Sequence, residues 1–293
     1  RIFIDGERVD TLSTASSRSE TGYRLFEVAD GHHSFEVRAV GNGPVRIFGV
    51  AIERDTPGVI LDTVGIPGAR ADFHIMWNDA LYREQLARRR PDLVVLAYGT
   101  NEASDDDLLI APYEKHLREV MDRIKEIVPA ASCLLIGPSD LPRKLLDSPD
   151  DEQGSENAEK QASFQESSLD AGHAVELEAV PDAALDIGAD SGQLAWPEAA
   201  WYAERGFGPR PLTEEIIAVQ RRVARDYQCG FFDLVRFMGG EMSMVRWAAA
   251  SPALGAADHI HLTSKGYGLL AEVLHRALMA SYRPGGSRSR ETD

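Results

Sequence analysis

Two short stretches of this sequence carry the residue types of an acyl-transfer site. They are Gly99-Thr100-Asn101-Glu102, at the end of an apolar run, and Asp258-His259-Ile260-His261, near the C-terminus. An asparagine side chain can donate an N–H to a developing oxyanion. A histidine can take the proton of a nucleophile, while an aspartate orients the imidazole and stabilises its charged form. The sequence therefore predicts ester hydrolysis that uses Asn101, Asp258 and His261.

Spacing alone leaves other interpretations open. Gly and Asn are common in turns and at helix N-termini, so Asn101 could be a turn residue. The pattern Asp-x-x-His is weak, because residues 30–33 and 170–173 match it too. One match lies at a predicted hairpin turn and the other in an acidic segment. Only residues 258–261 lie between the last predicted strand and the final helix, and there we expect His259 to point away from the site.

A third stretch, Gly65-Ile66-Pro67-Gly68-Ala69-Arg70, follows a strand predicted over residues 59–64. A glycine N–H at such a strand end can serve as a second oxyanion donor, because without a Cβ the backbone can approach the reacting centre. A plain turn between a strand and a helix explains this stretch equally well.

The elements that would position these residues differ along the chain. Residues 1–54 predict about four strands, because Asp5-Gly6 and Asp30-Gly31 are hairpin turn signals between apolar segments. After the first hairpin the predicted strands cover residues 23–28, 34–40 and 45–52. This part resembles a jelly-roll carbohydrate-binding module, although four strands are too few to close such a sandwich. The segment from Arg1 already has the pattern of a strand, so we expect the natural polypeptide to start further upstream.

From residue 55 onward the pattern alternates between strands and helices. Strands that are apolar on both faces and alternate with helices indicate a parallel sheet in a three-layer α/β/α sandwich. The predicted strands cover residues 59–64, 92–98, 132–136 and 229–234, and the predicted helices cover 78–90, 113–128, a segment capped by Thr213, and 264–282.

Residues 144–194 interrupt this alternation. The segment is strongly acidic and has Phe164 as its only aromatic residue, so it cannot bury enough apolar surface to order itself. We expect a disordered surface insertion here, with a functional lid as the alternative, and a disordered tail at 284–293.

The formal charge of −16 argues against a nucleic-acid partner, which would need a basic face.

The remaining composition excludes some other classes. No apolar run approaches the roughly 20 residues that a membrane helix needs. The sequence shows no signal peptide, but this is uninformative because we expect the natural polypeptide to start further upstream. Cys133 and Cys229 both lie in apolar runs, so we expect two buried thiols and neither a disulfide nor a metal site. We predict no cofactor.

These residues together resemble the SGNH/GDSL family of serine esterases and lipases. Three of the family's four sequence blocks have counterparts here in the right order, and the resemblance covers residues 55–282 without 144–194. It implies that Gly68 and Asn101 form the oxyanion hole. It also implies that Asp258 and His261 are the acid and the base, and that the sheet has the flavodoxin-like strand order 2-1-3-4-5.

The fourth block, a Gly-Asp-Ser after the first strand, is absent from the sequence. Ser139 is a poor substitute, and the family's first strand belongs in the interior of the sheet. Similar bacterial peptidoglycan and polysaccharide O-acetylesterases carry a carbohydrate-binding-like β module after the serine block. The resemblance therefore implies a nucleophile and a first strand upstream of Arg1, then the end of a β module at residues 1–54 and the hydrolase-like domain at 55–283.

The resulting prediction is a serine carboxylic-ester hydrolase that removes O-acetyl groups from a carbohydrate or cell-wall polymer outside the cytoplasm. Without its serine the chain alone should be inactive. Trp77 and Trp247 could line the substrate cleft, although packing explains them as well. The alternatives are a carbohydrate-binding protein that has lost its nucleophile, and a lipase or thioesterase of the same family. The sequence leaves the oligomeric state open.

Overall fold

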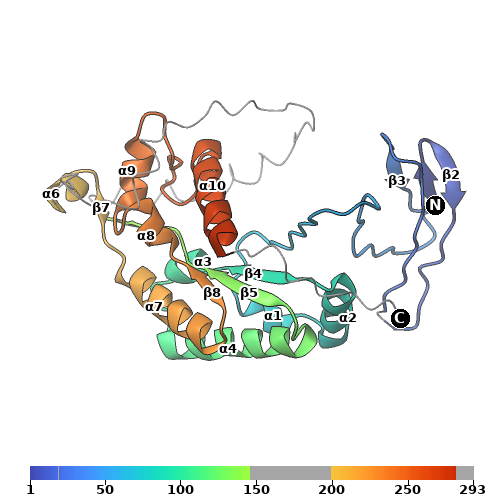
Figure 1. Ribbon diagram of the computed structural model, residues 1–293, viewed down its shortest axis with the longest axis horizontal. Coiled ribbons are helices and arrows are strands. Elements are labelled where there is room, and N and C mark those ends of the chain that lie inside the picture. Colours follow the sequence, from blue (N-terminus) through green and yellow to red (C-terminus); the bar gives the residue numbers. More distant parts are fainter. Residues whose placement is uncertain (19, 146–198, 282–293) are drawn as a thin grey trace. The chain divides into compact units, whose positions relative to one another are not determined.

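The computed structural model describes residues 1–18, 20–145 and 199–281 (Figure 1). The chain forms two compact units, which we treat separately. The first unit contains residues 1–67 and 77–88, and the second contains residues 68–76 and 89–293. The predicted acidic insertion, from residue 146 onward, and the predicted tail at 284–293 lie outside the described residues.

The first unit is built on a small antiparallel sheet with the strand order β2-β1-β3. The Asp5-Gly6 hairpin prediction is confirmed: both residues have positive φ, 52° and 81°, as a tight two-residue turn requires. β3 pairs with β1 through Ile2 and Val37. The strands are β1 (Ile2–Ile4), β2 (Glu7–Asp10) and β3 (Phe35–Val37).

Helix α2 (Asp79–Arg89) includes most of the predicted helix 78–90. Its first turn is capped by Asn78, whose Oδ1 accepts the N–H of Leu81 at 3.0 Å.

The strands predicted over residues 23–28, 45–52 and 59–64 do not form, so those predictions are wrong. Their apolar side chains are exposed: Leu25 by 83%, Ile52 by 83% and Val59 by 97%. A strand needs a neighbour for its backbone hydrogen bonds. In the described part of the chain no strand pairs with these segments, so alternating apolar residues alone do not produce strands here.

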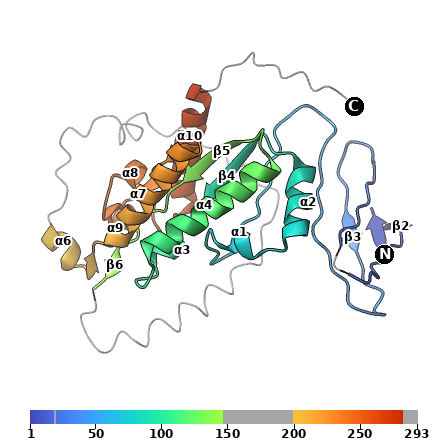
Figure 2. The same ribbon diagram turned by 90° about the horizontal axis from the view of Figure 1, so that it is seen from below.

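The second unit contains a parallel sheet with the order β4-β5-β8, and helices lie on both sides of it, as the α/β prediction required (Figures 1 and 2). The strands are β4 (Leu93–Ala97), β5 (Ser132–Ile136) and β8 (Gly230–Phe232). One side is covered by α4 (Ile110–Ile127) and α7 (Pro211–Asp226), and the other by α8 (Leu234–Met238), α9 (Ser243–Ala249) and α10 (Ser264–Ser281).

Each side of the sheet has its own core. The inner face of α4 buries four apolar residues that are each at most 2% exposed, namely Leu117, Val120, Met121 and Ile124. A cluster from α8, α9, α10 and the loop before α10 packs with Phe232 of β8, and its buried members are Leu234, Met238, Met244, Trp247, Leu262 and Leu269. The sheet is thereby held between two apolar layers.

Several short elements were not predicted from the sequence. They are α1 (Phe73–Met76), α3 (Thr100–Ala103), β6 (Arg143–Lys144), α6 (Ala199–Ala203), β7 (Phe207–Gly208), α8 and α9. None is long enough to show a clear hydrophobic period. Among the described residues, the search for a helix of sufficient length and apolar character to cross a bilayer finds none.

Two local predictions in this unit need correction. β4 is not buried on both faces, because Leu93 and Val95 are 40% and 43% exposed. These two residues alternate along the strand and share one face, which the described residues cover only in part. Within the described residues only β5 pairs with β4. Thr213 does not cap α7, because Pro211 already occupies the start of the helix, where its fixed φ is favourable.

The prediction of two free thiols is also wrong. Cys133 and Cys229 form a disulfide with their Cα atoms 4.7 Å apart. β5 and β8 pair Leu134 with Gly230, and this register places the preceding residues side by side. The two cysteines are 96 positions apart in the sequence, so the apolar setting of each one gave no sign of the other.

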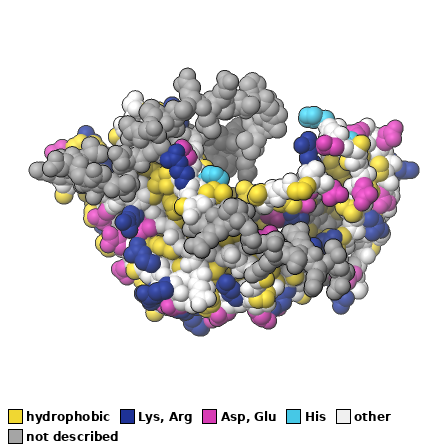
Figure 3. Space-filling view, viewed as in Figure 1, with side chains coloured by type: hydrophobic (Ala, Val, Ile, Leu, Met, Phe, Trp, Pro, Cys, Tyr) yellow, Lys and Arg dark blue, Asp and Glu magenta, His cyan; other side chains and the backbone are white. Residues whose placement is uncertain are grey.

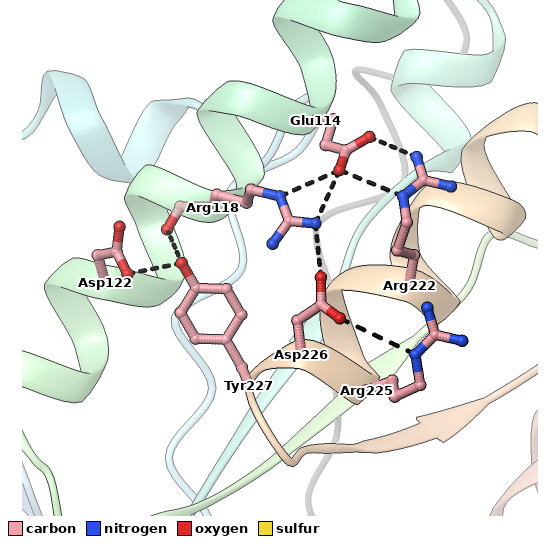
Figure 4. Close-up of polar contacts among 7 residues, drawn as sticks. All are labelled: Glu114, Arg118, Asp122, Arg222, Arg225, Asp226 and Tyr227. Atoms are coloured by element: carbon pink, nitrogen blue, oxygen red, sulfur yellow. Dashed lines mark hydrogen bonds and ion pairs between the residues drawn. The ribbon is translucent and has the colours of Figure 1, made fainter.

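An ionic network joins α4 to α7 on their solvent-facing side (Figure 4). Glu114 accepts hydrogen bonds from Arg118 at 2.8 Å and from Arg222, and Arg118 also contacts Asp226 at 2.7 Å. Figure 3 shows acidic and basic side chains interspersed over α7. The hydrogen bonds from Arg222 and Arg118 lower the pKa of Glu114 to about 2.

This network predicts a specific loss of stability in acid. Because the folded-state pKa of Glu114 lies below its ordinary value, its contribution is present above about pH 4.5 and is lost as the pH falls towards 2. Glu114→Gln should reduce the free energy of unfolding by about 1 kcal/mol at neutral pH and by much less near pH 3. Urea denaturation at both pH values measures the difference. Glu119→Gln on the same helix is the control, and an equal loss at both pH values would contradict the assignment.

Candidate active site

The turn after β4 is fixed by close packing. Gly99 has a φ of +122°, and a Cβ on it would lie 2.8 Å from Cδ of Pro138. Only glycine fits this conformation and this close approach. Gln220 of α7 donates a hydrogen bond to the carbonyl of Tyr98 at 2.8 Å. The end of β4 is therefore held against the segment that follows β5.

Asn101 lies in the first turn of α3, directly after this turn. Its Nδ2 donates a hydrogen bond to the carbonyl of Ala69 at 2.8 Å. A primary amide has two N–H groups. The second one has no acceptor among the described residues, so it remains available to a reacting oxygen.

The structure brings Gly68 and Asn101 into the same neighbourhood, because Gly68 precedes Ala69, the residue that Asn101 contacts. Gly68 has a φ of +73°, and the space that a Cβ would occupy has no atom within 4 Å. The backbone of Gly68 is thus open on that side.

Two buried side chains, to which the sequence pattern assigns no role of their own, support these segments. Glu102 is 2% exposed and accepts the N–H groups of Ala71 and Gly99. His74 of α1 is buried, with its Nε2 2.9 Å from the hydroxyl of Tyr98. Burial lowers the pKa of His74 to about 4, so the ring is neutral near pH 7. Neither role has a sequence signal, because each depends on a contact between distant segments.

Asp258 and His261 lie in contact. The Nδ1 of His261 is 2.7 Å from Oδ2 of Asp258, while Oδ1 of Asp258 accepts the backbone N–H groups of Ile260 and His261. Burial raises the pKa of Asp258, but the hydrogen bonds from His261 and from the backbone outweigh it, so this pKa lies below its ordinary value. The carboxylate is therefore ionised and holds the imidazole through Nδ1.

The other ring nitrogen of His261 is open. The side chain is 68% exposed, and no hydrogen bond to its Nε2 is found among the described residues. The loop itself is fixed, because Ala256 donates to the carbonyl of His261 at 2.8 Å and Thr263 contacts the N–H of Gly266 at the start of α10. The neighbouring His259 packs its ring against Phe207, with the ring centroids 4.3 Å apart.

The proposed oxyanion donors, Gly68 and Asn101, and the pair Asp258 and His261 lie at the same edge of the sheet. Ser139, which follows β5, contacts the carbonyl of Ile260 through its Oγ at 3.4 Å, and Asn101 follows β4. The carboxyl ends of parallel strands meet at one edge, where open α/β sheets place their sites. Ser139 itself is 7% exposed and its hydroxyl faces a backbone carbonyl, so it is poorly placed as a nucleophile.

The two tryptophans occupy different settings. Trp247 is 6% exposed and packs in the core with Phe237, so it offers little surface to a substrate. Trp77 belongs to the first unit, where its ring lies 5.4 Å from that of Tyr82.

In the described part of the chain no group of three or more His, Cys, Asp or Glu residues is arranged to hold a metal ion.

The fold and these residues define an α/β protein with a polar site at the carboxyl edge of a parallel sheet. The chain belongs to the GDSL-like lipase/acylhydrolase family, whose sequence model matches residues 35–269.

Solved structures with similar chains include a peptidoglycan O-acetylesterase, with 26% identity and a TM-score of 0.46 over 73% of this chain and 45% of that one. An acetyl xylan esterase has 15% identity and a TM-score of 0.39 over 73% and 79% of the two chains. The lipase/acylhydrolase from Enterococcus faecalis has 16% identity and a TM-score of 0.37 over 75% of each chain. This chain thus spans less than half of the first of these proteins. A comparison with curated proteins finds no match.

Proposed function

We propose that this chain supplies most of the active site of a serine carboxylic-ester hydrolase. The observation that carries the proposal is the contact between His261 and Asp258, 2.7 Å long, with the second imidazole nitrogen open. Asn101 and the Gly68 segment lie at the same sheet edge and can donate N–H groups to an oxyanion. Family membership supports the same class of reaction.

The reaction would proceed in two halves. A serine hydroxyl attacks the ester carbonyl while Nε2 of His261 takes its proton, and Asp258 stabilises the imidazolium. The N–H groups of Gly68 and Asn101 hold the negative oxygen of the tetrahedral intermediate. The intermediate expels the alcohol, which receives the proton from His261. Water then attacks the acyl-enzyme with His261 again as the base, and the acid and the free serine are released.

The nucleophile in this proposal is a serine outside these 293 residues. The sequence has no Gly-Asp-Ser, and Ser139 is buried against a backbone carbonyl. Two features of β4 support the proposal. Within the described residues one edge of β4 has no partner strand, and the apolar side chains on one of its faces, Leu93 and Val95, are partly exposed. A strand added there would end at the same sheet edge as Asn101.

For the substrate, we propose O-acetyl groups on a carbohydrate or cell-wall polymer. The separate sheet of the first unit supports this choice, since it fits part of a β-sandwich carbohydrate-binding module, an analogy at the level of fold. We also propose a location outside the cytoplasm. The disulfide between Cys133 and Cys229 supports it, because disulfides persist in oxidising compartments.

A binding protein without a nucleophile is the second candidate, favoured by the absence of Gly-Asp-Ser. The test treats the gene-encoded polypeptide that contains this chain with a fluorophosphonate and locates the label by mass spectrometry. We expect label on one serine outside Arg1–Asp293, together with release of acetate from an O-acetylated polysaccharide. Label on Ser139 would overturn the proposed nucleophile. Polysaccharide binding without label or acetate release would favour the second candidate, and a preference for long-chain acyl esters would favour a lipase or thioesterase.

A further inference from the structure

We propose that Glu102 is a positioning residue that holds the two oxyanion-donor segments of this site at a fixed separation. The inference rests on the proposed function for its catalytic meaning. Its structural basis is a single buried carboxylate that contacts both segments.

The two oxygens of Glu102 have different partners. Oε1 accepts the N–H of Ala71 at 2.9 Å, and Oε2 accepts the N–H of Gly99 at 2.9 Å. Ala71 lies three residues after Gly68, and Gly99 lies two residues before Asn101. The carboxylate therefore joins the segment that carries one proposed donor to the segment that carries the other, across 31 positions of sequence.

A carboxylate suits this position better than other side chains. The two partners are both donors, so the bridging group needs two acceptor oxygens, whereas an amide has only one. Burying a charge is costly unless it is hydrogen-bonded. A helix cap for the four-residue α3 needs only the contact to Gly99. The contact to Ala71 indicates a second task for this side chain.

Other contacts also restrict the movement of the two segments that carry Gly68 and Asn101. Asn101 donates to the carbonyl of Ala69 at 2.8 Å, and Arg70 pairs with Asp105 at 2.8 Å. On its other side Gly99 packs so closely against Pro138 that a Cβ would not fit between them. Oxyanion stabilisation depends on donors preset at hydrogen-bond distance from the reacting oxygen, so a shift of a few tenths of an ångström between the segments would weaken it.

The first test reads the bridge directly by NMR in the 293-residue chain, without any substitution. Burial raises the pKa of Glu102 above its ordinary value of 4.5, although the backbone N–H groups of Ala71, Gly99 and Glu102 itself, and the charge of Arg70, oppose this rise. Tyr98 and Tyr113 also face this carboxyl, but burial raises their own pKa values, so neither titrates in acid. The amide proton shifts of Ala71 and Gly99 should therefore titrate together, with one midpoint above 4.5. Separate midpoints, or no titration, would overturn the bridge.

The second test uses Glu102→Gln, which keeps the shape but removes one acceptor. The shared titration should disappear, and exchange of the Ala71 and Gly99 amides with solvent should become at least about tenfold faster. In the serine-bearing polypeptide, kcat for a chromogenic acetyl ester should fall about 10- to 100-fold with KM within about twofold, per active site counted with fluorophosphonate.

Glu114→Gln, in the α4–α7 ionic network, is the matched control for a loss of stability and should leave kcat unchanged. Unchanged kcat in Glu102→Gln, or an equal fall in both variants, would overturn the positioning role. An inactive wild-type polypeptide would count against the proposed function alone, because the two amides would still titrate together.

Discussion

His261→Ala in the serine-bearing polypeptide should lower kcat for acetyl-ester hydrolysis by about 10⁴-fold or more, with little change in KM. The structure gives the reason: Nδ1 of His261 lies 2.7 Å from the Asp258 carboxylate, and the exposed Nε2 is the nitrogen that can take the serine proton. Without this base the hydroxyl stays protonated, and what remains is the contribution of the oxyanion hole and of binding.

Steady-state kinetics with a chromogenic acetyl ester measure this effect. His275→Ala is the matched control, because His275 is an exposed histidine on α10, the helix that follows the His261 loop. It should leave kcat unchanged. If His261→Ala hydrolyses the ester as fast as wild type, the proposed base is wrong.

Asn101→Ala should lower kcat by about 10²- to 10³-fold, again with a small effect on KM. One N–H of the Asn101 amide is fixed by the carbonyl of Ala69 at 2.8 Å, and this contact aims the other one. A single lost oxyanion donor costs on the order of 3 kcal/mol in the transition state. Because the oxyanion forms only after attack, the ground state should bind nearly as well.

Measuring kcat together with a thermal unfolding scan distinguishes the loss of a hydrogen-bond donor from a loss of stability. Glu114→Gln, in the same unit as Asn101, should cost about 1 kcal/mol of stability at neutral pH without changing kcat. Equal kinetic losses in the two variants would show that Asn101 acts through stability. A KM effect without a kcat effect would assign Asn101 to substrate binding.

The parallel part of the fold was predictable from the sequence. Residues 132–136 form β5 as predicted, and the helix predicted over 113–128 is included in α4 apart from its last residue, because each has a strong and regular apolar pattern. The run at 59–64 is also rich in apolar residues but forms no strand. A pattern of apolar residues predicts what a segment can form, whereas a strand also needs a neighbour, and that depends on the rest of the sheet.

In the candidate site, too, some features could be predicted from the sequence and others depend on the rest of the fold. Asp30-x-x-His33 has the same spacing as Asp258-x-x-His261, yet His33 contacts Asp5 at 2.7 Å through Nδ1. Spacing alone therefore does not predict which aspartate a histidine contacts. The Glu102 bridge and the disulfide could not be predicted, since each joins residues far apart in the sequence through strand pairing and loop packing.

The most direct test of the account is a crystal structure of the serine-bearing polypeptide after reaction with a small phosphonate. We predict a phosphonylated serine directly after a strand that pairs with the edge of β4 that has no partner among the described residues. Its phosphoryl oxygen should lie within hydrogen-bond distance of Nδ2 of Asn101 and the N–H of Gly68, with Nε2 of His261 facing the serine oxygen. A phosphoryl group that contacts neither Asn101 nor His261 would contradict the account.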